Sequence, residues 1–355
     1  MKPLRFATLI SDQDRQFIDH LAPISEKLKI PLIISDEEIE SLIKTYYPLV
    51  RVIYKDPLDL GFYITQNFEV IYTCLPNPIF REVVFTAELV HEKTLFNVWC
   101  PHGNSDKGYK GKYLESLSEE HFALVYGQQL IDFLIEKGSF NQLEGIIITG
   151  NYRLKHYNEN KSFYQKKLME LINFNNNKTI LYAPTWKDDE DSSSFDVAFK
   201  PIIETLPDHL NLLIKPHPNL FASPELFELF LCQFPKKKNV AVLSDFPPVY
   251  PLLDFVDFYL GDMSSVGYDF LSFNKPMFFL NTNKRNPKED KGLYLTRCGP
   301  LIEPEDYENI FSIIENTNPR PFEKIQTNIY DQVFGEEEDF KEKVIEVYDK
   351  RFQYS

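Results

Sequence analysis

Residues 258–270 have the sequence FYLGDMSSVGYDF, in which an apolar run is followed by Gly-Asp, two serines and a helical pattern. Val266, Phe270 and Phe273 fall roughly on one helical face, so the stretch predicts a strand, a turn and a helix. The same succession of apolar run, turn and amphipathic stretch recurs along the chain. Parallel sheets covered by helices have this pattern, and the sequence therefore predicts a doubly wound α/β fold.

Apolar runs predict the strands of this fold in both halves of the chain. The expected strands are 6–10, 31–35, 50–54, 62–65, 70–74, 94–99, 123–126, 145–149, 179–183, 210–214, 240–243, 258–260 and 277–280. Phe340, Val344 and Tyr348 lie near helical spacing, so residues 339–352 predict a helix at the C-terminus.

The length of the chain predicts two domains, because 355 residues exceed what one hydrophobic core usually serves. Residues 151–178 are rich in asparagine and contain a helical segment, which indicates a connection between domains. We therefore expect two Rossmann-like parallel-sheet domains that face each other across a cleft. The expected segments are 1–155 and 179–335 for the two domains, 156–178 for a connecting helix and loop, and 336–355 for the C-terminal helix.

The net charge, the cysteines and the lack of a long apolar run argue against a nucleic-acid-binding or membrane-spanning protein. The formal net charge of −15 repels phosphate backbones at long range, so we expect no nucleic-acid partner. The basic run Lys236–Lys238 is interpreted as a solvated loop. The four cysteines are far apart, and the chain has no long apolar run, so we expect a cytoplasmic protein without a membrane span.

His102 follows the expected strand 94–99 and precedes Gly103. An imidazole has an ordinary pKa of about 6.5, which suits proton abstraction at neutral pH. Glycine lets the backbone approach a ligand closely. His102 is therefore a candidate general base, and the alternative is a histidine that only satisfies a turn.

Lys215 and His217 follow the expected strand 210–214 in the segment KPHP. The two prolines fix their own φ angles and favour extended backbone in the residue before each of them. Such a rigid polar tip can neutralise a diphosphate and steady the oxygen that leaves with a nucleotide. The alternative is a Pro-His-Pro turn with a structural role only.

Asp262, Ser264 and Ser265 lie where the expected strand 258–260 passes into a helix. Ligands of open α/β sheets bind beyond the carboxyl ends of strands, and a helix N-terminus with hydroxyl groups favours phosphate. The alternative is simple N-capping by Asp262 or Ser264. Thr185 and Lys187 follow another expected strand and are candidate diphosphate contacts.

Four motifs in a fixed order carry a family resemblance. HGNSDK (102–107), YAPTWK (182–187), KPHP (215–218) and GDMSSVGYDF (261–270) resemble motifs of the CDP-glycerol glycerophosphotransferase family, the teichoic-acid primases and polymerases. The resemblance covers roughly residues 94–300. Members of this family resemble glycosyltransferases of the GT-B class, so the resemblance implies a GT-B-like α/β fold.

The resemblance implies a transfer of polyol phosphate from CDP-glycerol or a related CDP-polyol. An acceptor hydroxyl attacks the phosphorus nearest the polyol, and CMP leaves. His102 in the N-terminal, acceptor-side domain would be the base, and His217 in the C-terminal, donor-binding domain would act on the pyrophosphate side. The implied substrate or nucleotide contacts are Gly103, Lys107, Thr185, Lys187, Lys215, Asp262, Ser264 and Ser265.

The expected partners are the nucleotide-activated polyol and an acceptor, either a polyol phosphate or a glycan, which in such families is lipid-linked. No acidic pair lies at an expected strand tip, so we expect no metal ion and no other cofactor. The chain shows no long basic amphipathic helix with a strong apolar face. We therefore expect at most peripheral contact with the inner face of the cell membrane.

Two other functions remain open from the sequence. The first is a GT-B glycosyltransferase or a UDP-sugar 2-epimerase that uses a nucleotide sugar. The second is a family member that binds a nucleotide or scaffolds a surface-polymer assembly without turnover. Lys187 stands where the family typically has arginine, and Asn104-Ser105-Asp106 stands where the family has a proline.

Overall fold

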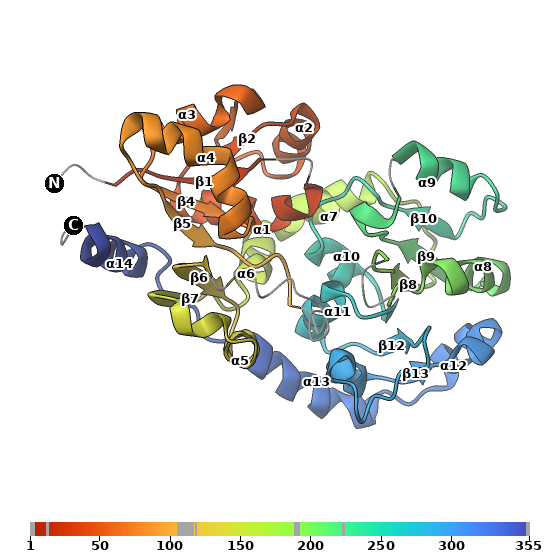
Figure 1. Cartoon of the computed structure of the whole chain (residues 1–355). Helices are drawn as coiled ribbons and strands as arrows, with labels where there is room; N and C mark the ends of the chain where they lie inside the picture. The colour runs from red at the N-terminus through yellow and green to blue at the C-terminus, as the bar shows by residue number, and fades with distance from the viewer. Residues whose placement is uncertain are drawn as a thin grey trace. The chain divides into compact units, whose positions relative to one another are not determined.

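The computed structural model describes residues 4–11, 14–104, 117, 119–187, 192–221 and 224–352 of the chain. The chain forms two compact units, each built around its own sheet (Figure 1). The first unit comprises Met1–His102, Lys112–Glu159 and Gln332–Ser355, and the second comprises Gly103–Gly111 and Asn160–Asp331.

The first unit contains a parallel sheet of seven strands in the order β3-β2-β1-β4-β5-β6-β7. Its strands are β1 (Phe6–Ile10), β2 (Leu32–Ile34), β3 (Val52–Tyr54), β4 (Val70–Thr73), β5 (Phe96–Trp99), β6 (Phe122–Val125) and β7 (Gly145–Ile148). The strand β1 pairs with both β2 and β4, in the registers Thr8↔Leu32 and Thr8↔Tyr72. From β1 the chain adds β2 and β3 on one side of the sheet, and it then adds β4 to β7 on the other side, as in doubly wound folds.

Helices cover this sheet, most of them between successive strands. They are α1 (Ile18–Leu28), α2 (Glu37–Tyr46), α3 (Pro57–Asn67), α4 (Asn77–His91), α5 (Gln128–Glu136), α6 (Tyr152–Glu159) and α14 (Glu342–Phe352), with short 3₁₀ turns η1 (Arg15–Phe17) and η3 (Ser139–Gln142). The expected C-terminal helix is α14. Its Tyr348 and Phe352 rings meet the ring of Phe96 on β5 edge-on, with centroids 5.9 Å and 6.4 Å away.

Residues 62–65, which the sequence predicts as a strand, lie inside helix α3, so that prediction is wrong. The Asp56 side chain caps this helix by accepting a 2.9 Å hydrogen bond from the backbone N–H of Leu58. Pro57 occupies the first turn, where a proline is well tolerated. Leu60 and Ile64 are buried four residues apart, so helical burial outweighs the short strand-like run.

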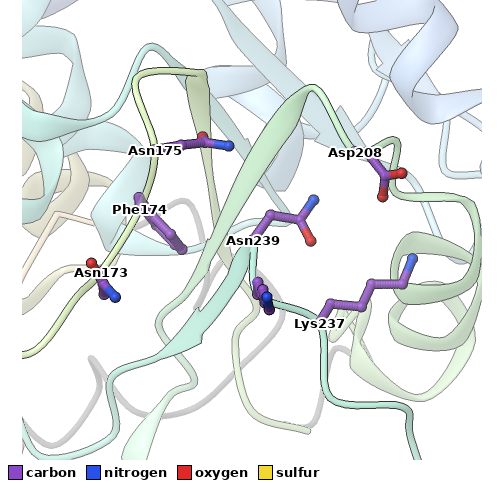
Figure 2. Close-up of a pocket in the computed structure, with 7 residues that line it drawn as sticks. Asn173, Phe174, Asn175, Asp208, Lys237 and Asn239 are labelled. Atoms are coloured by element: carbon purple, nitrogen blue, oxygen red, sulfur yellow. The ribbon is translucent and has the colours of Figure 1, made fainter.

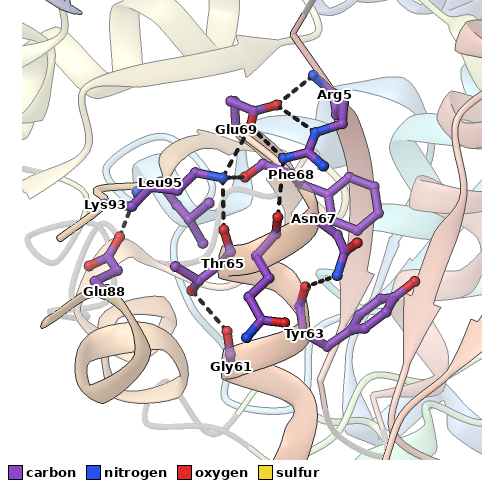
Figure 3. Close-up of polar contacts among 11 residues, drawn as sticks. Arg5, Gly61, Tyr63, Thr65, Asn67, Phe68, Glu69, Glu88, Lys93 and Leu95 are labelled. Carbon is purple, nitrogen blue, oxygen red and sulfur yellow. Dashed lines mark hydrogen bonds and ion pairs between the residues drawn. The ribbon is translucent and has the colours of Figure 1, made fainter. Parts of the chain in front are cut away.

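The C-terminal end of α3 is held by a polar network of the first unit (Figure 3). The Lys93 ammonium donates to the carbonyl oxygens of Thr65 and Phe68, where a helix end favours a cation. Burial alone would raise the pKa of the Glu69 carboxyl. Hydrogen bonds from Arg5 and Lys93 outweigh this effect and hold the pKa of Glu69 at about 2.

The second unit contains a parallel sheet of six strands in the order β10-β9-β8-β11-β12-β13. Its strands are β8 (Lys178–Ala183), β9 (Leu210–Ile214), β10 (Val240–Val242), β11 (Phe258–Gly261), β12 (Met277–Leu280) and β13 (Leu301–Ile302). The chain runs outward from β8 to β10 and then returns to pair β11 with β8. The topological switch point of this sheet therefore lies between the carboxyl ends of β8 and β11.

Helices and 3₁₀ turns precede, connect and follow the strands of the second unit. They are α7 (Lys161–Met169), α8 (Phe195–Thr205), η4 (Pro218–Leu220), α9 (Pro224–Leu231), α10 (Tyr250–Phe255), α11 (Ser265–Phe270), η5 (Leu271–Phe273), η6 (Lys291–Cys298), η7 (Pro304–Asn309), α12 (Ile310–Asn316) and α13 (Arg320–Val333). Phe195 and Phe199 of α8 meet Phe230 of α9 with ring centroids 4.9 Å and 5.0 Å away. This aromatic cluster forms one side of the core.

The described ranges contain α-helices of six to fifteen residues. None of the helices there combines the length and the apolar character that crossing a bilayer requires.

Candidate active site

His102 lies in the first unit, three residues beyond the end of β5. Its half-buried ring packs against the ring of Phe17, with the centroids 5.2 Å apart. Burial lowers the pKa of His102 to about 4, because it disfavours the charged imidazolium. The ring is therefore neutral at pH 7 and able to accept a proton.

Glu120 is a buried carboxyl that the sequence reasoning did not single out. It lies just before β6 and accepts hydrogen bonds from the backbone N–H of Asn77 and from the side-chain amide of Asn97, the latter at 3.1 Å. Burial raises the pKa of Glu120 to about 8. At pH 7 the carboxyl is therefore mostly protonated, and it links β5 and α4 to the start of β6.

Replacing Glu120 with glutamine is expected to make the protein more stable than the wild type at pH 9 but not at pH 5. The pKa of Glu120 is about 8 in the folded protein, and its reference value is 4.5. Protonation of Glu120 therefore stabilises the folded state fully below pH 4.5, and this stabilisation is lost as pH rises through 8. Between pH 5 and pH 9, the contribution of Glu120 to the free energy of unfolding changes by on the order of 4 kcal/mol, at about 1.4 kcal/mol per pKa unit. Urea unfolding at both pH values measures it.

The control for this experiment is Glu119→Gln, because Glu119 is the exposed neighbour of Glu120. We expect the Glu119 variant to keep the pH dependence of the wild type. Equal pH dependence of the wild type and the Glu120 variant would rule out a buried, protonated carboxyl at this position.

In the second unit, Asp262 connects the two loops that flank the switch point. Its side chain is fully buried, and it accepts hydrogen bonds from the backbone N–H of Thr185 at 2.9 Å and of Ser194 at 2.8 Å. The Ser194 hydroxyl donates a further bond at 2.8 Å. Asp262 therefore fixes the loop after β8 against the end of β11. The sequence did not indicate Ser194 as part of this site.

The start of α11 lies directly after this carboxylate. Ser264 is the N-cap residue, and its hydroxyl accepts a 3.4 Å hydrogen bond from the backbone N–H of Val266. Ser265, the first helical residue, is half-buried and follows the cap. Of the two capping residues considered from the sequence, the structure has Ser264 in this role.

Gly103 lies against Ser265 within the second unit. Gly103 has φ +126°, and a Cβ atom built on it would be 2.6 Å from the Cβ of Ser265. Both the backbone conformation and the close approach exclude a side chain at position 103. The glycine of the His-Gly pair is therefore required by its packing on the start of α11.

His217 lies beyond the end of β9, between two prolines, as the sequence predicts. Its Nδ1 accepts a 3.1 Å hydrogen bond from the backbone N–H of Asn219. In the neutral ring the proton is then on Nε2, which can donate to an anionic oxygen. The ring lies 6.1 Å from the indole of Trp186, which is 38% exposed.

The two candidate lysines differ in their surroundings. The ammonium of Lys215 donates a 3.1 Å hydrogen bond to the carbonyl oxygen of Ser244, in the loop that follows β10. Lys187 is exposed beside Trp186. Lys107 is outside the described residues.

The candidate residues are thus distributed over both units. Seven of them lie in the second unit, either after the carboxyl end of a strand or at the start of α11. They are Gly103, which packs against that helix, Thr185, Lys215, His217, Asp262, Ser264 and Ser265. Lys187 lies in the same unit, and His102 lies in the first. The expected pairing of the two imidazoles on one diphosphate stays a prediction.

A pocket of about 570 Å³ lies at the amino ends of the strands of the second sheet, among residues that precede β8, β9 and β10 (Figure 2). Lys237 and Lys238 of the basic run line it together with Asp208, and the ammonium of Lys237 donates to the carbonyl oxygen of Leu206 at 3.2 Å. Ligands of such sheets bind at the carboxyl ends of the strands, so this pocket is separate from the candidate site.

Two parallel Rossmann-like sheets with polar residues after their carboxyl strand ends define a protein of the GT-B class. The structure superposes on that of a variant of the wall teichoic acid polymerase TagF with a TM-score of 0.64 and 17% sequence identity. The match covers 100% of this chain and 90% of the TagF chain. MnaA of S. aureus, in a structure with UDP, matches with a TM-score of 0.61 and 13% identity, covering 94% and 93%. The expected α/β fold of GT-B type is confirmed.

The chain belongs to the CDP-Glycerol:Poly(glycerophosphate) glycerophosphotransferase family, whose profile matches residues 111–339. The teichoic acid glycerol-phosphate primase of Bacillus subtilis (strain 168) is 28% identical over 184 residues. That alignment covers 51% of this chain and 44% of the primase. The family expected from the four motifs is therefore confirmed.

Proposed function

We propose that this protein transfers a polyol phosphate from a CDP-activated donor, CDP-glycerol or a related CDP-polyol, to an acceptor hydroxyl in the synthesis of a teichoic-acid-like polymer. The observation that carries the proposal is the family match together with the position of His217 and the start of α11 after carboxyl strand ends of one sheet. His-Pro and Gly-Asp-Met-Ser-Ser are motifs on which the family resemblance rests.

In the proposed reaction the acceptor oxygen attacks the phosphorus that bears the polyol. The acceptor proton passes to the neutral imidazole of His102. The bond between this phosphorus and the bridging diphosphate oxygen breaks, and CMP leaves with the electron pair. The Nε2–H of His217 would donate to this oxygen as its charge develops, which lowers the barrier without a chemical change in the protein.

The remaining candidate residues of the second unit would hold the diphosphate. Ser265 presents a hydroxyl at the start of a helix, where the helix dipole attracts phosphate oxygens. Lys187 and Lys215 supply positive charge, and Asp262 keeps the Thr185 loop in place. This set of donors leads us to propose transfer without a metal ion or other cofactor.

The acceptor in this proposal is a polyol phosphate or a glycan, in lipid-linked form. The protein would then act in the cytoplasm, with at most peripheral contact with the inner face of the cell membrane. The chain spans less than half the length of the curated primase that it matches. Its own donor and acceptor therefore need a direct test.

Incubation with CDP-glycerol and a polyol-phosphate acceptor is expected to release CMP and extend the acceptor by one glycerol phosphate. We expect the same rate in the presence of EDTA, because lysine, histidine and helix-start donors neutralise the diphosphate. Chromatography of the nucleotide and mass spectrometry of the acceptor measure both products.

CDP-ribitol and UDP-N-acetylglucosamine serve as alternative donors in the same assay. Product formed only from the UDP-sugar would replace this proposal with a nucleotide-sugar enzyme. Tight nucleotide binding without any product would indicate a binding protein without turnover. A rate that is lost in EDTA and restored by magnesium would contradict metal-independent transfer.

A further inference from the structure

A buried chain of hydrogen bonds in the first unit ends at the residue before His102. The phenol of Tyr126, the residue that follows β6, donates a 3.0 Å hydrogen bond to the carbonyl oxygen of Pro101. The Nδ1 atom of His20, on α1, lies 3.0 Å from the same phenol oxygen. The chain thus links α1, the end of β6 and the His-Gly turn.

The direction of each bond follows from the chemistry of the groups. A carbonyl oxygen only accepts, so the single phenol proton of Tyr126 goes to Pro101. The phenol oxygen then accepts from the Nδ1–H of His20. Burial, together with the charge of Arg153, lowers the pKa of His20 well below 6.5, so this ring is neutral and has one proton to donate.

The phenol of Tyr126 is itself held in place by its neighbours. Its ring stacks on the ring of Tyr152 with the centroids 6.2 Å apart and an angle of 9° between the planes. The ring of Phe334 meets it edge-on at 5.9 Å. The hydroxyl of Tyr152 donates a 3.0 Å hydrogen bond to the carbonyl oxygen of His20. The ring that carries the donor to Pro101 is therefore held by two aromatic contacts, and its stacking partner Tyr152 is itself bonded to α1.

We infer that Tyr126 is a positioning residue for His102, which acts by holding the Pro101 carbonyl and hence the peptide from which the imidazole projects. This inference rests on the proposed function, in which His102 is the base. Pro101 has no N–H and a fixed φ angle, so its carbonyl is the one backbone group of this residue that can form a hydrogen bond. Gly103, with φ +126°, turns the chain immediately afterwards. The imidazole is thus positioned between a tethered residue and a tight turn.

Position matters because a base must lie within hydrogen-bond reach of the proton that it removes. A displacement of about 1 Å at a reacting group can lower a rate about a hundredfold. Phe17 contacts the ring of His102, and this aromatic contact does not set the position of the backbone from which the ring projects. The tether through Tyr126 supplies that constraint at the backbone.

The test is Tyr126→Phe, which removes one hydroxyl and keeps the stacked ring. We expect kcat for CMP release to fall about tenfold to a hundredfold, with the KM for CDP-glycerol unchanged. Tyr47→Phe is the matched control, because Tyr47 is a fully buried tyrosine of the same unit whose hydroxyl bonds to Asp19 at 2.6 Å. We expect the control to lower the urea midpoint by a similar amount and to keep the wild-type kcat.

The same substitution in a His102→Ala background separates positioning from general destabilisation. If Tyr126 acts through His102, the double variant has the same residual rate as His102→Ala alone. An equal fractional loss in both backgrounds, or a wild-type kcat in Tyr126→Phe, overturns the inference while the proposed function stands. A wild-type rate in His102→Ala overturns the inference together with the assignment of His102 as the base.

Discussion

His102→Ala is expected to lower the rate of CMP release about 10³-fold, a loss typical of removing a general base. The imidazole is neutral at pH 7 because burial holds its pKa at about 4, so it is fully in the form that accepts a proton. Steady-state kinetics with CDP-glycerol and a polyol-phosphate acceptor measure the loss. The KM for the donor is expected to stay near its wild-type value, because His217 and the start of α11 would bind the diphosphate.

The pH profile gives this prediction a second readout. Activity of the wild type is expected to fall as pH drops through about 4, where His102 gains its proton, and the alanine variant should lack this decline. His91→Ala is the control, since His91 is another half-buried histidine of the first unit. A loss smaller than about tenfold in His102→Ala, roughly 1.4 kcal/mol, would refute the assignment of the base.

Asp262→Ala is expected to lower the free energy of unfolding by about 3 kcal/mol, because it leaves buried donors without their acceptor. The backbone N–H groups of Thr185 and Ser194 and the Ser194 hydroxyl all donate to this fully buried carboxylate. The loop after β8 would lose its attachment to β11, so nucleotide affinity should fall as well. Urea unfolding and calorimetric titration with CMP measure the two effects.

Asp208→Ala provides the comparison for this variant. Asp208 is an exposed carboxylate of the same unit. It precedes β9 and lines the pocket at the amino ends of the strands. Its replacement is expected to change neither stability nor CMP affinity. A stable Asp262 variant that has lost CMP binding would mean that the carboxylate contacts the ligand and does not act through the loop.

The sequence predicts most strands of both sheets because continuous apolar runs between turns are a local signal. It fails for residues 62–65, where Phe62 and Ile64 resemble a short strand. The structure there is decided by the Asp56 cap and by burial of one helical face. The sequence also misses β13, since Leu301 and Ile302 form too short a run to be distinguished from a loop.

The candidate site could be predicted only where the chemistry is local. His217 between its prolines and Ser264 at the start of α11 are evident from neighbouring residues. Asp262 finds its donors 77 and 68 positions earlier in the chain, so its role in shaping the Thr185 loop depends on the pairing of β8 with β11. Tyr126 reaches Pro101 across 25 positions in the same way, through adjacent strands.

The exposed indole beside His217 also has a practical consequence. The chain contains two tryptophans, and the other, Trp99, is the buried last residue of β5 in the first unit. Each unit therefore carries its own fluorophore. Variants with phenylalanine at one position or the other would emit from a single unit, and denaturant titrations of the two proteins would report whether the two sheets melt in one cooperative transition or in two.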